Sequence, residues 1–432
     1  MSDYESKVRR FAAAVVALAL CMPVVAAEAP LTLAEAQRRA LARAPQLSAQ
    51  DAAAAAAREM AVAAGQWPDP VLKLGVDNLP VDGADAWSLT KDFMTMGRIG
   101  VMQEIVSSDK RQTRAARFER EAEKAQVERA AAQANVARDV ALAWLDRYYA
   151  EATVALIERQ AAEAALEIEA AEVAYRSGRG TQADVFAARG AKAALAEKAS
   201  DARRRVATSV TMLARWVGPG ADAPLSAAPD MASVPIDAGR MDDVAHHPQI
   251  AALTRALDLA NAEVDVAQAN RNPGWSVEVA YQQRGPAYSN MMSFAVSIPL
   301  PWDRANRQDR DVAARLALVD QARAQREDAL RARVAEVAAM LDEWRNGRER
   351  LALYADSILP LARDRTEAAT TAYRGGKGTL ADVLAARRAE LDVRRDALML
   401  ERETARAWAQ LNFLDVAADA HAAVVSTAKE PR

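Results

Sequence analysis

The sequence has almost no cysteine. Cys21 is the one cysteine among 432 residues, and it lies in an apolar segment near the N-terminus, FAAAVVALALCMPVV. Basic residues precede this segment and small residues close it, which is the pattern of a secretory leader spanning residues 1–27. We expect cleavage after about Ala27, and acylation of Cys21 is the less favoured alternative. The mature chain would then hold neither a disulfide nor a thiolate metal site.

Other absences exclude further classes of protein. Histidine occurs three times, and 59 acidic residues stand against 56 basic ones, so no nucleic-acid partner is expected. No run after the leader reaches about 18 apolar residues, which excludes a transmembrane helix. No P-loop, dinucleotide-binding glycine pattern or G-x-S-x-G elbow occurs, so we expect no enzyme and no cofactor. A soluble periplasmic protein, a secreted one and an outer-membrane β-barrel remain.

Proline is scarce in two long stretches rich in alanine, glutamate, arginine and leucine. One runs from about 110 to 176 and the other from about 304 to 374, where Pro360 is the one proline. A helix of about 70 residues spans roughly 100 Å. Apolar residues recur every seven positions from Leu330 through Val337 and Trp344 to Ile358, which favours coiled-coil-like packing. After each long stretch, a shorter helix at about 181–217 or 379–414 is expected to run back alongside the long one.

The turn between each long helix and its return helix has a similar sequence in both halves of the chain. Residues 169–189 and 367–387 agree at 15 of 21 positions, at an offset of 198. Such a repeat indicates a duplicated structural unit. Each copy has a glycine suited to end one helix and a threonine and aspartate suited to cap the next: Gly178, Thr181 and Asp184 in the first, Gly376, Thr379 and Asp382 in the second.

Each half also carries two β-rich runs, expected as strands at about 71–79 and 98–106 and at about 275–283 and 292–300. In the third run Val277, Val279 and Tyr281 alternate with polar residues, as in a strand with a lipid side and a water side. A hairpin of a soluble domain is the alternative. Because four strands cannot close a barrel and open edges are forbidden in lipid, membrane strands require oligomerisation, and a trimer would supply twelve.

The expected organisation therefore has five parts. A leader at 1–27 is followed by a first repeat at 28–217, with its turn at 177–181. A Pro-, Gly- and Ala-rich linker at 218–236 leads to a second repeat at 237–414, with its turn at 375–379. A loose tail occupies 415–432.

The paired motif Tyr-Arg-x-Gly-x-Gly-Thr-x-x-Asp-Val, the Pro-bounded strands and the early segment LTLAEAQRRALARAPQL resemble TolC-type outer-membrane efflux channels, most of all the heavy-metal branch of CusC- and CzcC-like proteins. The resemblance covers about 31–414. It implies a mixed α and β membrane protein, a homotrimer with a twelve-stranded β-barrel in the outer-membrane lipid and a helical barrel in the periplasm. A periplasmic adaptor and an inner-membrane RND pump are its implied partners, and metal cations such as copper/silver or cobalt/zinc/cadmium its implied cargo.

The resemblance also assigns roles to the two turns, at the periplasmic tip. Glycines match adaptor-docking positions, namely Gly178 and Gly376, together with their neighbours Gly180 and Gly378. Three residues match positions of the closing aperture, namely Asp184, Asp382 and Tyr373. Gly378 and Ala385 stand where drug-efflux members carry Arg and Asp, so we expect the closing contacts to differ, with Arg179 and Lys377 as substitute basic partners.

Several alternatives remain open at this point. The pair Asp184 and Asp382 either only caps helices or also forms a ring of carboxylates at the pore. Five methionines near the strands either bind soft metal ions or pack against lipid and neighbours: Met94, Met96, Met102, Met291 and Met292. A drug-efflux or type I secretion channel is a second candidate function. A periplasmic coiled-coil adaptor or binding protein is a candidate from another class.

Overall fold

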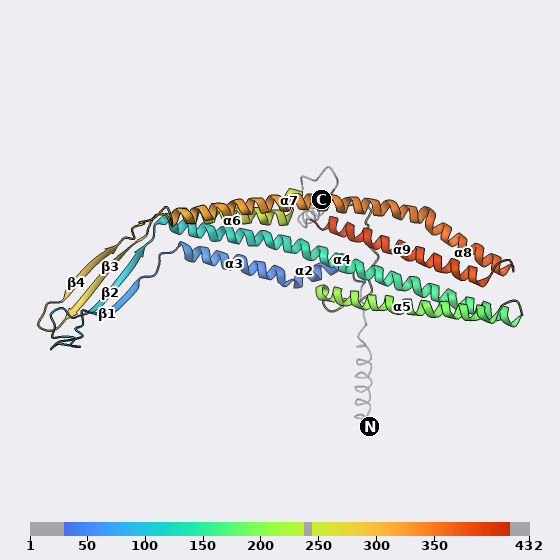
Figure 1. Ribbon diagram of the computed structural model, residues 1–432, viewed down its shortest axis with the longest axis horizontal. Coiled ribbons are helices and arrows are strands. Elements are labelled where there is room, and N and C mark those ends of the chain that lie inside the picture. Colours follow the sequence, from blue (N-terminus) through green and yellow to red (C-terminus); the bar gives the residue numbers. More distant parts are fainter. Residues whose placement is uncertain (1–29, 237–243, 415–432) are drawn as a thin grey trace, which may run out of the picture. The chain divides into compact units, whose positions relative to one another are not determined.

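The computed structural model describes residues 30–236 and 244–414 (Figure 1). The expected leader with Cys21 and the expected tail at 415–432 lie outside these residues. The contacts divide the chain into two compact units. One takes its described residues from 1–43, 139–232 and 349–406, and the other from 44–138, 233–348 and 407–432. Each unit therefore combines segments from both halves of the sequence.

One unit contains a four-stranded antiparallel sheet (Figure 1). Its strands are β1 (Val71–Asp77), β2 (Met96–Ile105), β3 (Trp275–Arg284) and β4 (Met291–Ser297), paired in the order β1-β2-β3-β4. All four lie where β-rich runs predict strands, with bounds that differ by up to three residues. Two strands thus come from each half of the sequence, and β2 with β3 joins the halves through ten residue pairs.

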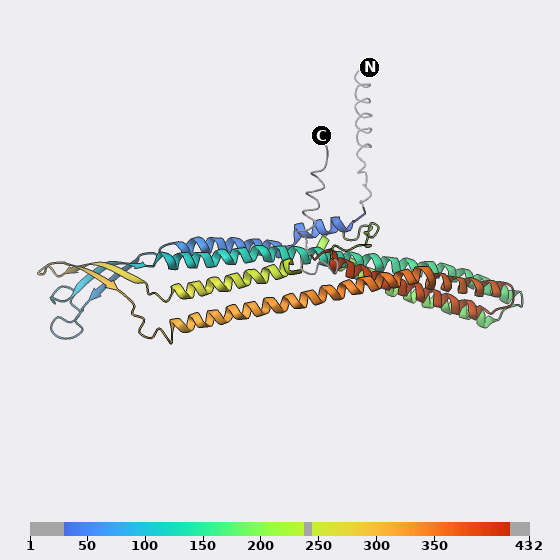
Figure 2. The same cartoon turned by 90° about the horizontal axis from the view of Figure 1, so that it is seen from above.

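Helices α3 (Pro45–Gly65) and α6 (Pro248–Ala269) precede the two strand pairs. Both begin at a proline, whose missing N–H costs nothing in the first turn of a helix. Helices α4 (Ser108–Arg176) and α7 (Gln308–Leu353) follow the strand pairs. Figure 2 shows α6 and the 308–348 part of α7 alongside each other, with α6 running towards the strands and α7 away from them. Ion pairs join neighbouring helices: Arg129 with Asp51 at 2.8 Å and Arg315 with Glu263 at 2.7 Å.

The seven-residue spacing in α7 marks its inward face. Val337 and Trp344 are buried, and Leu330 is half-buried. The expected helix at 304–374 is, however, not uniform. A π-helical turn, η2 (Tyr354–Ile358), separates α7 from α8 (Leu359–Arg374), and the N–H of Leu359 donates to the carbonyl of Tyr354, five residues back. Pro360 follows at once and has no N–H to continue the α-helical ladder, which favours such a distortion.

The other unit contains α2 (Leu33–Arg43), the 139–176 part of α4, α5 (Gln182–Val217), α8 and the 380–406 part of α9 (Leu380–Asn412). A strap at 218–226 crosses it, and Leu31 pairs with Leu225 as a single parallel bridge. Trp144 of α4 is fully buried and its indole N–H donates to the carbonyl of Leu31 at 3.0 Å. The buried guanidinium of Arg147 donates to strap carbonyls, including that of Ala223 at 2.9 Å. These contacts satisfy polar groups that burial would otherwise leave costly.

No helix within residues 30–236 and 244–414 is both long and apolar enough to cross a membrane.

Candidate functional sites

The two repeated turns have the same geometry. In each, a glycine with positive φ ends the helix, Gly178 at +73° and Gly376 at +70°, as the sequence predicts. Two residues later the N–H of Gly180 donates to the carbonyl of Ala174 at 3.0 Å, and that of Gly378 does the same to Ala372 at 3.1 Å.

The second glycine of each turn is fixed by close packing. A Cβ on Gly180 would lie 3.1 Å from the Cβ of Ala174, and one on Gly378 would lie equally close to that of Ala372. A larger residue would push the turn away from the helix end. The four glycines assigned to adaptor docking therefore each have a local structural reason, and docking itself stays a prediction.

A reciprocal capping box starts each return helix, as the Thr and Asp spacing predicts. The N–H of Asp184 donates to the hydroxyl of Thr181 at 3.2 Å, and the Asp184 carboxylate accepts from the Thr181 N–H at 2.8 Å. Asp382 and Thr379 make the same pair of bonds at 3.2 and 3.1 Å. Hydrogen bonds from the Thr181 backbone and hydroxyl hold the pKa of Asp184 below its usual range, and those from Thr379 do so for Asp382.

A small apolar cluster joins the two hairpins just behind their turns. It consists of five buried side chains with Tyr373 among those packed against it: Ala171 of α4, Val185 and Ala188 of α5, and Leu380 and Val383 of α9. The two turns therefore lie side by side, as Figure 1 also shows. The half-exposed Asp184 and the exposed Asp382 therefore lie at the same end of the unit.

The two expected basic partners differ in their contacts. The Arg179 Nε donates to the Ser177 hydroxyl at 3.2 Å, so it lies folded onto its own turn. Lys377 is exposed at the matching position of the second turn. A role of Arg179 and Lys377 as basic partners in closing the aperture stays a prediction.

A third basic side chain, Arg387 of α9, was not predicted from the sequence to have a role. Its guanidinium donates to Glu167 of α4 at 2.6 Å and also pairs with Glu163. Glu163 and Glu167 are four residues apart, so they share one face of α4. Burial raises the pKa of Glu167, and the attraction of Arg387 opposes that rise. The i,i+4 glutamate pair was visible in the sequence, but its partner 220 residues away was not.

In the unit that contains strands β1–β4, the sheet has one apolar face and one polar face. The register aligns apolar residues across all four strands in two rows: Leu74, Ile99, Tyr281 and Met292 in one, and Leu72, Val101, Val279 and Phe294 in the other. All eight side chains are exposed in the single chain, including Leu74 at 70% and Phe294 at 74%. Val277 and Tyr281 share this face, as their alternation predicts.

The opposite face carries charged and polar side chains. Glu278 at its centre pairs with Lys73 at 2.7 Å and also with Arg98, so three strands contribute to one charged network. Beside it, the Gln282 amide donates to the Ser293 hydroxyl at 3.2 Å. A sheet built this way presents hydrocarbon on one side and water-binding groups on the other.

The sheet register separates the five methionines proposed as metal ligands. Met292 lies on the apolar face, whereas Met96, Met102 and Met291 alternate onto the polar face. Met96 and Met102 are six residues apart on β2, about 20 Å at 3.3 Å per residue, so they cannot share one ion. Met94 lies before β2, where its N–H donates to Asp92 at 2.6 Å. A metal role for these residues stays a prediction, and no group of three His, Cys, Asp or Glu suited to a metal ion occurs among the described residues.

Comparison with known proteins supports the same fold. Residues 243–415 match the protein family described as outer membrane efflux protein. No protein among the curated sequences matches the chain.

Solved structures resemble almost the whole chain. CusC, described in terms of folding and transmembrane channel formation, has a TM-score of 0.74 at 16% identity over 88% of this chain and 91% of its own. The outer membrane protein VceC of Vibrio cholerae has 0.71 at 20% identity over 88% and 95%. The open MtrE outer membrane channel of Neisseria gonorrhoeae has 0.71 at 18% identity over 88% of both chains. The fold class predicted from the sequence is thereby confirmed.

Proposed function

We propose that this chain is the outer-membrane channel subunit of a tripartite efflux system, a passive duct without catalytic chemistry. The sheet carries the proposal, because its eight aligned apolar side chains are exposed on one face while the other face is charged. Monomeric soluble proteins rarely expose a contiguous apolar patch of this kind. A lipid environment is the simplest covering for it. The match of residues 243–415 to outer membrane efflux proteins supports the same function.

Trimerisation completes this proposal. Strands β1 and β4 each pair with one neighbour within the described chain, so each leaves one edge for another strand. In lipid those backbone groups need partners, and β1 of one copy against β4 of the next closes a ring. Three copies give twelve strands, an even number in the range of outer-membrane barrels. The long helices of three copies would then continue the duct into the periplasm, with the leader removed after export.

The turns serve as the docking end for a periplasmic adaptor, which links the duct to an inner-membrane RND pump. The observation in support is local: two turns of equal geometry lie side by side on one unit, and each has a glycine of positive φ followed two residues later by a closely packed glycine. Small residues leave the backbone open to an approaching partner helix. Side chains that differ between the copies, such as Arg179 and Lys377, would make the two docking positions non-equivalent.

Heavy-metal cations are the cargo we propose, by resemblance to the CusC- and CzcC-like branch. The depressed pKa values keep Asp184 and Asp382 ionised, so a trimer would place six carboxylates around the entrance and attract cations. Organic compounds or secreted polypeptides are the competing cargo. Deleting the gene should lower resistance to copper, silver, cobalt, zinc or cadmium salts. Lost resistance to organic compounds alone would contradict the metal cargo and leave the channel proposal intact.

Cell fractionation and electrophoresis test the channel itself. We expect the full chain in the outer membrane, migrating as a trimer before heating and as a monomer after it. A variant with Leu74→Asp and Phe294→Asp should fail to assemble, because it places carboxylates on the lipid side. A protein found in the soluble periplasm as a monomer would be the adaptor or binding protein of the competing class.

A further inference from the structure

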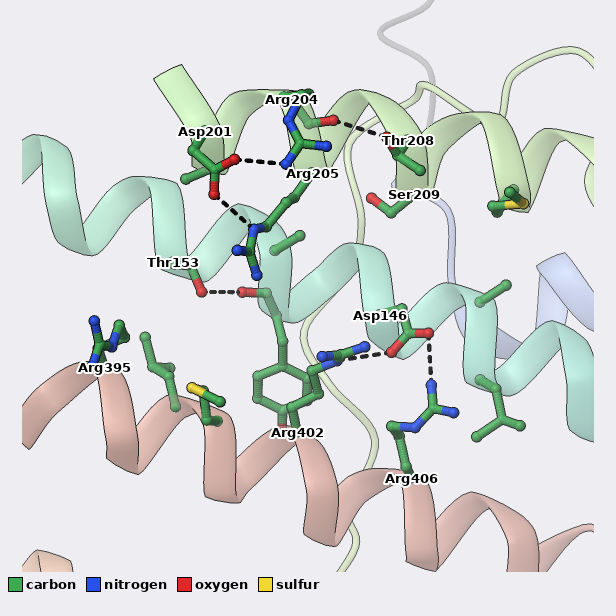
Figure 3. A pocket seen from close by; sticks show the side chains of 18 of the residues that line it. Asp146, Thr153, Asp201, Arg204, Arg205, Thr208, Ser209, Arg395, Arg402 and Arg406 are labelled. Atoms are coloured by element: carbon green, nitrogen blue, oxygen red, sulfur yellow. Dashed lines mark hydrogen bonds and ion pairs between the residues drawn. The ribbon is translucent and has the colours of Figure 1, made fainter. Parts of the chain in front are cut away.

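A groove of about 890 Å³ opens in the unit that carries the turns, between α4, α5 and α9 (Figure 3). Its volume falls in the range of roughly 300–1,000 Å³ that is usual for small-molecule sites. Residues from 139 to 157, from 197 to 216 and from 395 to 406 line it, so the groove belongs to a single compact unit. It lies apart from the turns and the sheet that carry the proposed function.

The apolar part of the groove comes from all three helices. Tyr149 and Ile157 of α4 are buried, whereas Met212 of α5 and Met399 of α9 are more than half exposed, at 57% and 52%. Trp216 of α5 also lines the groove. Flexible methionines and aromatic rings offer adaptable apolar surface to a ring-shaped ligand.

Cationic charge is concentrated on two opposite walls. On the α4–α9 wall, Asp146 accepts from Arg402 Nε at 2.9 Å and from Arg406 Nη1 at 2.6 Å. On the α5 wall, Asp201 accepts from Arg204 Nη2 at 2.6 Å and from Arg205 Nε at 3.0 Å. Figure 3 shows both triads facing the groove. Each has two guanidinium groups and one carboxylate, so each has a net charge of +1.

The groove lining has six cationic and four acidic side chains, a net charge of +2. Lys198 and Arg395 of this set pair with Asp392, and Arg395 also pairs with Asp396, so two aspartates outside the lining balance these two cations. The positive charge that faces a ligand therefore lies in the two triads. The hydrogen bonds from Arg204 and Arg205 hold the pKa of Asp201 below its usual range, so the triad keeps its +1 charge around neutral pH.

Each arginine has donors to spare. A guanidinium has five N–H groups, and a single bond to an aspartate leaves most of them available in the fixed fork that suits sulfonate or carboxylate oxygens. Arg204 and Arg205 have side chains 69% exposed, and that of Arg402 is 47% exposed. The donors therefore remain accessible to a ligand.

We propose that this groove binds an aromatic organic anion, with its ring system on the Tyr149, Met212 and Met399 surface and its acidic group against one of the two arginine–aspartate triads. The charge of the ligand follows from the net charge of the walls, and its ring from the apolar floor. The binding would be independent of export, because it needs only this unit. The ligand has the opposite charge to the cargo proposed above.

A matched pair of probes tests the proposal on the full chain, assembled in nanodiscs of zwitterionic phosphatidylcholine. The probes are 8-anilinonaphthalene-1-sulfonate and its uncharged counterpart N-phenyl-1-naphthylamine, with empty nanodiscs subtracted. In the variant Arg205→Gln with Arg402→Gln, each aspartate keeps one arginine, and the triads fall to zero net charge. Loss of one charge-assisted contact should raise the Kd of the sulfonate about tenfold or more and leave that of the neutral probe within about twofold.

Two further variants make the result specific. Arg331→Gln with Arg363→Gln removes the same charge from exposed positions outside the groove, where side chains are 80% and 68% exposed, and should leave both probes unchanged. Ala150→Trp fills the floor and should weaken both probes. Circular dichroism checks that each variant keeps its helices. An unchanged sulfonate Kd in the first variant, an equal loss in the control variant, or no binding beyond empty nanodiscs overturns the proposal.

Discussion

Arg387 and Glu167 lie 220 residues apart in the sequence and are joined by a hydrogen bond of 2.6 Å between α9 and α4. Glu167 is nearly enclosed, with 12% of its side chain exposed, and Arg387 is 27% exposed. Because α4 belongs to the hairpin of the first turn and α9 to that of the second, this pair ties the two hairpins together behind the apolar cluster. Surface pairs add little to stability, but a largely buried pair is costly to break.

Removing the arginine should therefore destabilise the hairpins. Arg387→Gln leaves Glu163 and Glu167 as neighbouring carboxylates without their cation, and we expect a loss of about 1–3 kcal/mol. Circular dichroism during denaturant unfolding gives the measure. Arg363→Gln is the control, since its pair with Glu367 is exposed on both sides and should contribute under about 0.5 kcal/mol. Equal losses in the two variants would refute the structural role of Arg387.

The stability contributed at Glu167 should also depend on pH. Burial raises its folded pKa above the unfolded value of about 4.3. For a raised pKa, the contribution is present below the unfolded pKa and is lost as pH rises through the folded one. The wild type should accordingly gain stability relative to Glu167→Gln as pH falls from 7 towards that window. A constant difference between the two proteins across this range would count against the shift.

The capping boxes predict the opposite pH dependence. The folded pKa of Asp184 is depressed, so its contribution is present above about pH 4 and is lost as pH falls through the folded value. Thr181→Ala should cost about 1 kcal/mol by removing the cap. Amide hydrogen exchange in the first turn of α5 reports both effects. Exchange that does not respond to acid, or to the alanine, would show that the box does not hold this helix end.

Two glycines of the same hairpin should respond in opposite directions to alanine. Gly178 has φ +73° with open space around it, so Gly178→Ala costs about 1 kcal/mol through backbone strain alone. Gly190 lies exposed inside α5, also in open space, and Gly190→Ala should stabilise the helix by up to about 1 kcal/mol. Thermal unfolding distinguishes them. Shifts of the same sign would contradict the left-handed turn.

The carboxylates at the turns can be tested in planar bilayers. Asp184→Ala combined with Asp382→Ala should raise ion conductance or reduce block by cations, because it removes the proposed ring of negative charge. Thr181→Ala with Thr379→Ala is the matched control, as it weakens the caps and keeps both carboxylates. If single-channel records of the aspartate variant equal those of the wild type, the gating role is lost and only the capping role remains.

Local chemistry made much of this structure predictable from the sequence. Gly178 needs a positive φ and Thr181 needs its aspartate three residues on, and both requirements are met within one turn. Alternation placed Val277 and Tyr281 on one face of a strand without knowledge of its neighbours. Contacts between distant segments were different: neither the partner of Glu167 nor the opposed triads at Asp146 and Asp201 leave a periodic pattern in the sequence, since each depends on how helices pack.

The π-helical turn at 354–358 shifts the packing face of the helix that follows it. Counted in sevens from Leu330, the next positions after Ile358 would be Arg365 and Ala372. The residue buried in α8 is instead Thr366, and the aromatic ring packed on the apolar cluster is that of Tyr373, each one position later. A π-turn holds one residue more than the α-helical turn it replaces. Deleting one residue here would let an ordinary α-helix keep Thr366 and Tyr373 on this face, whereas losing the π-turn without a deletion would rotate both by about 100° away from the cluster. The π-turn therefore accommodates one inserted amino acid without changing the phase of the second hairpin.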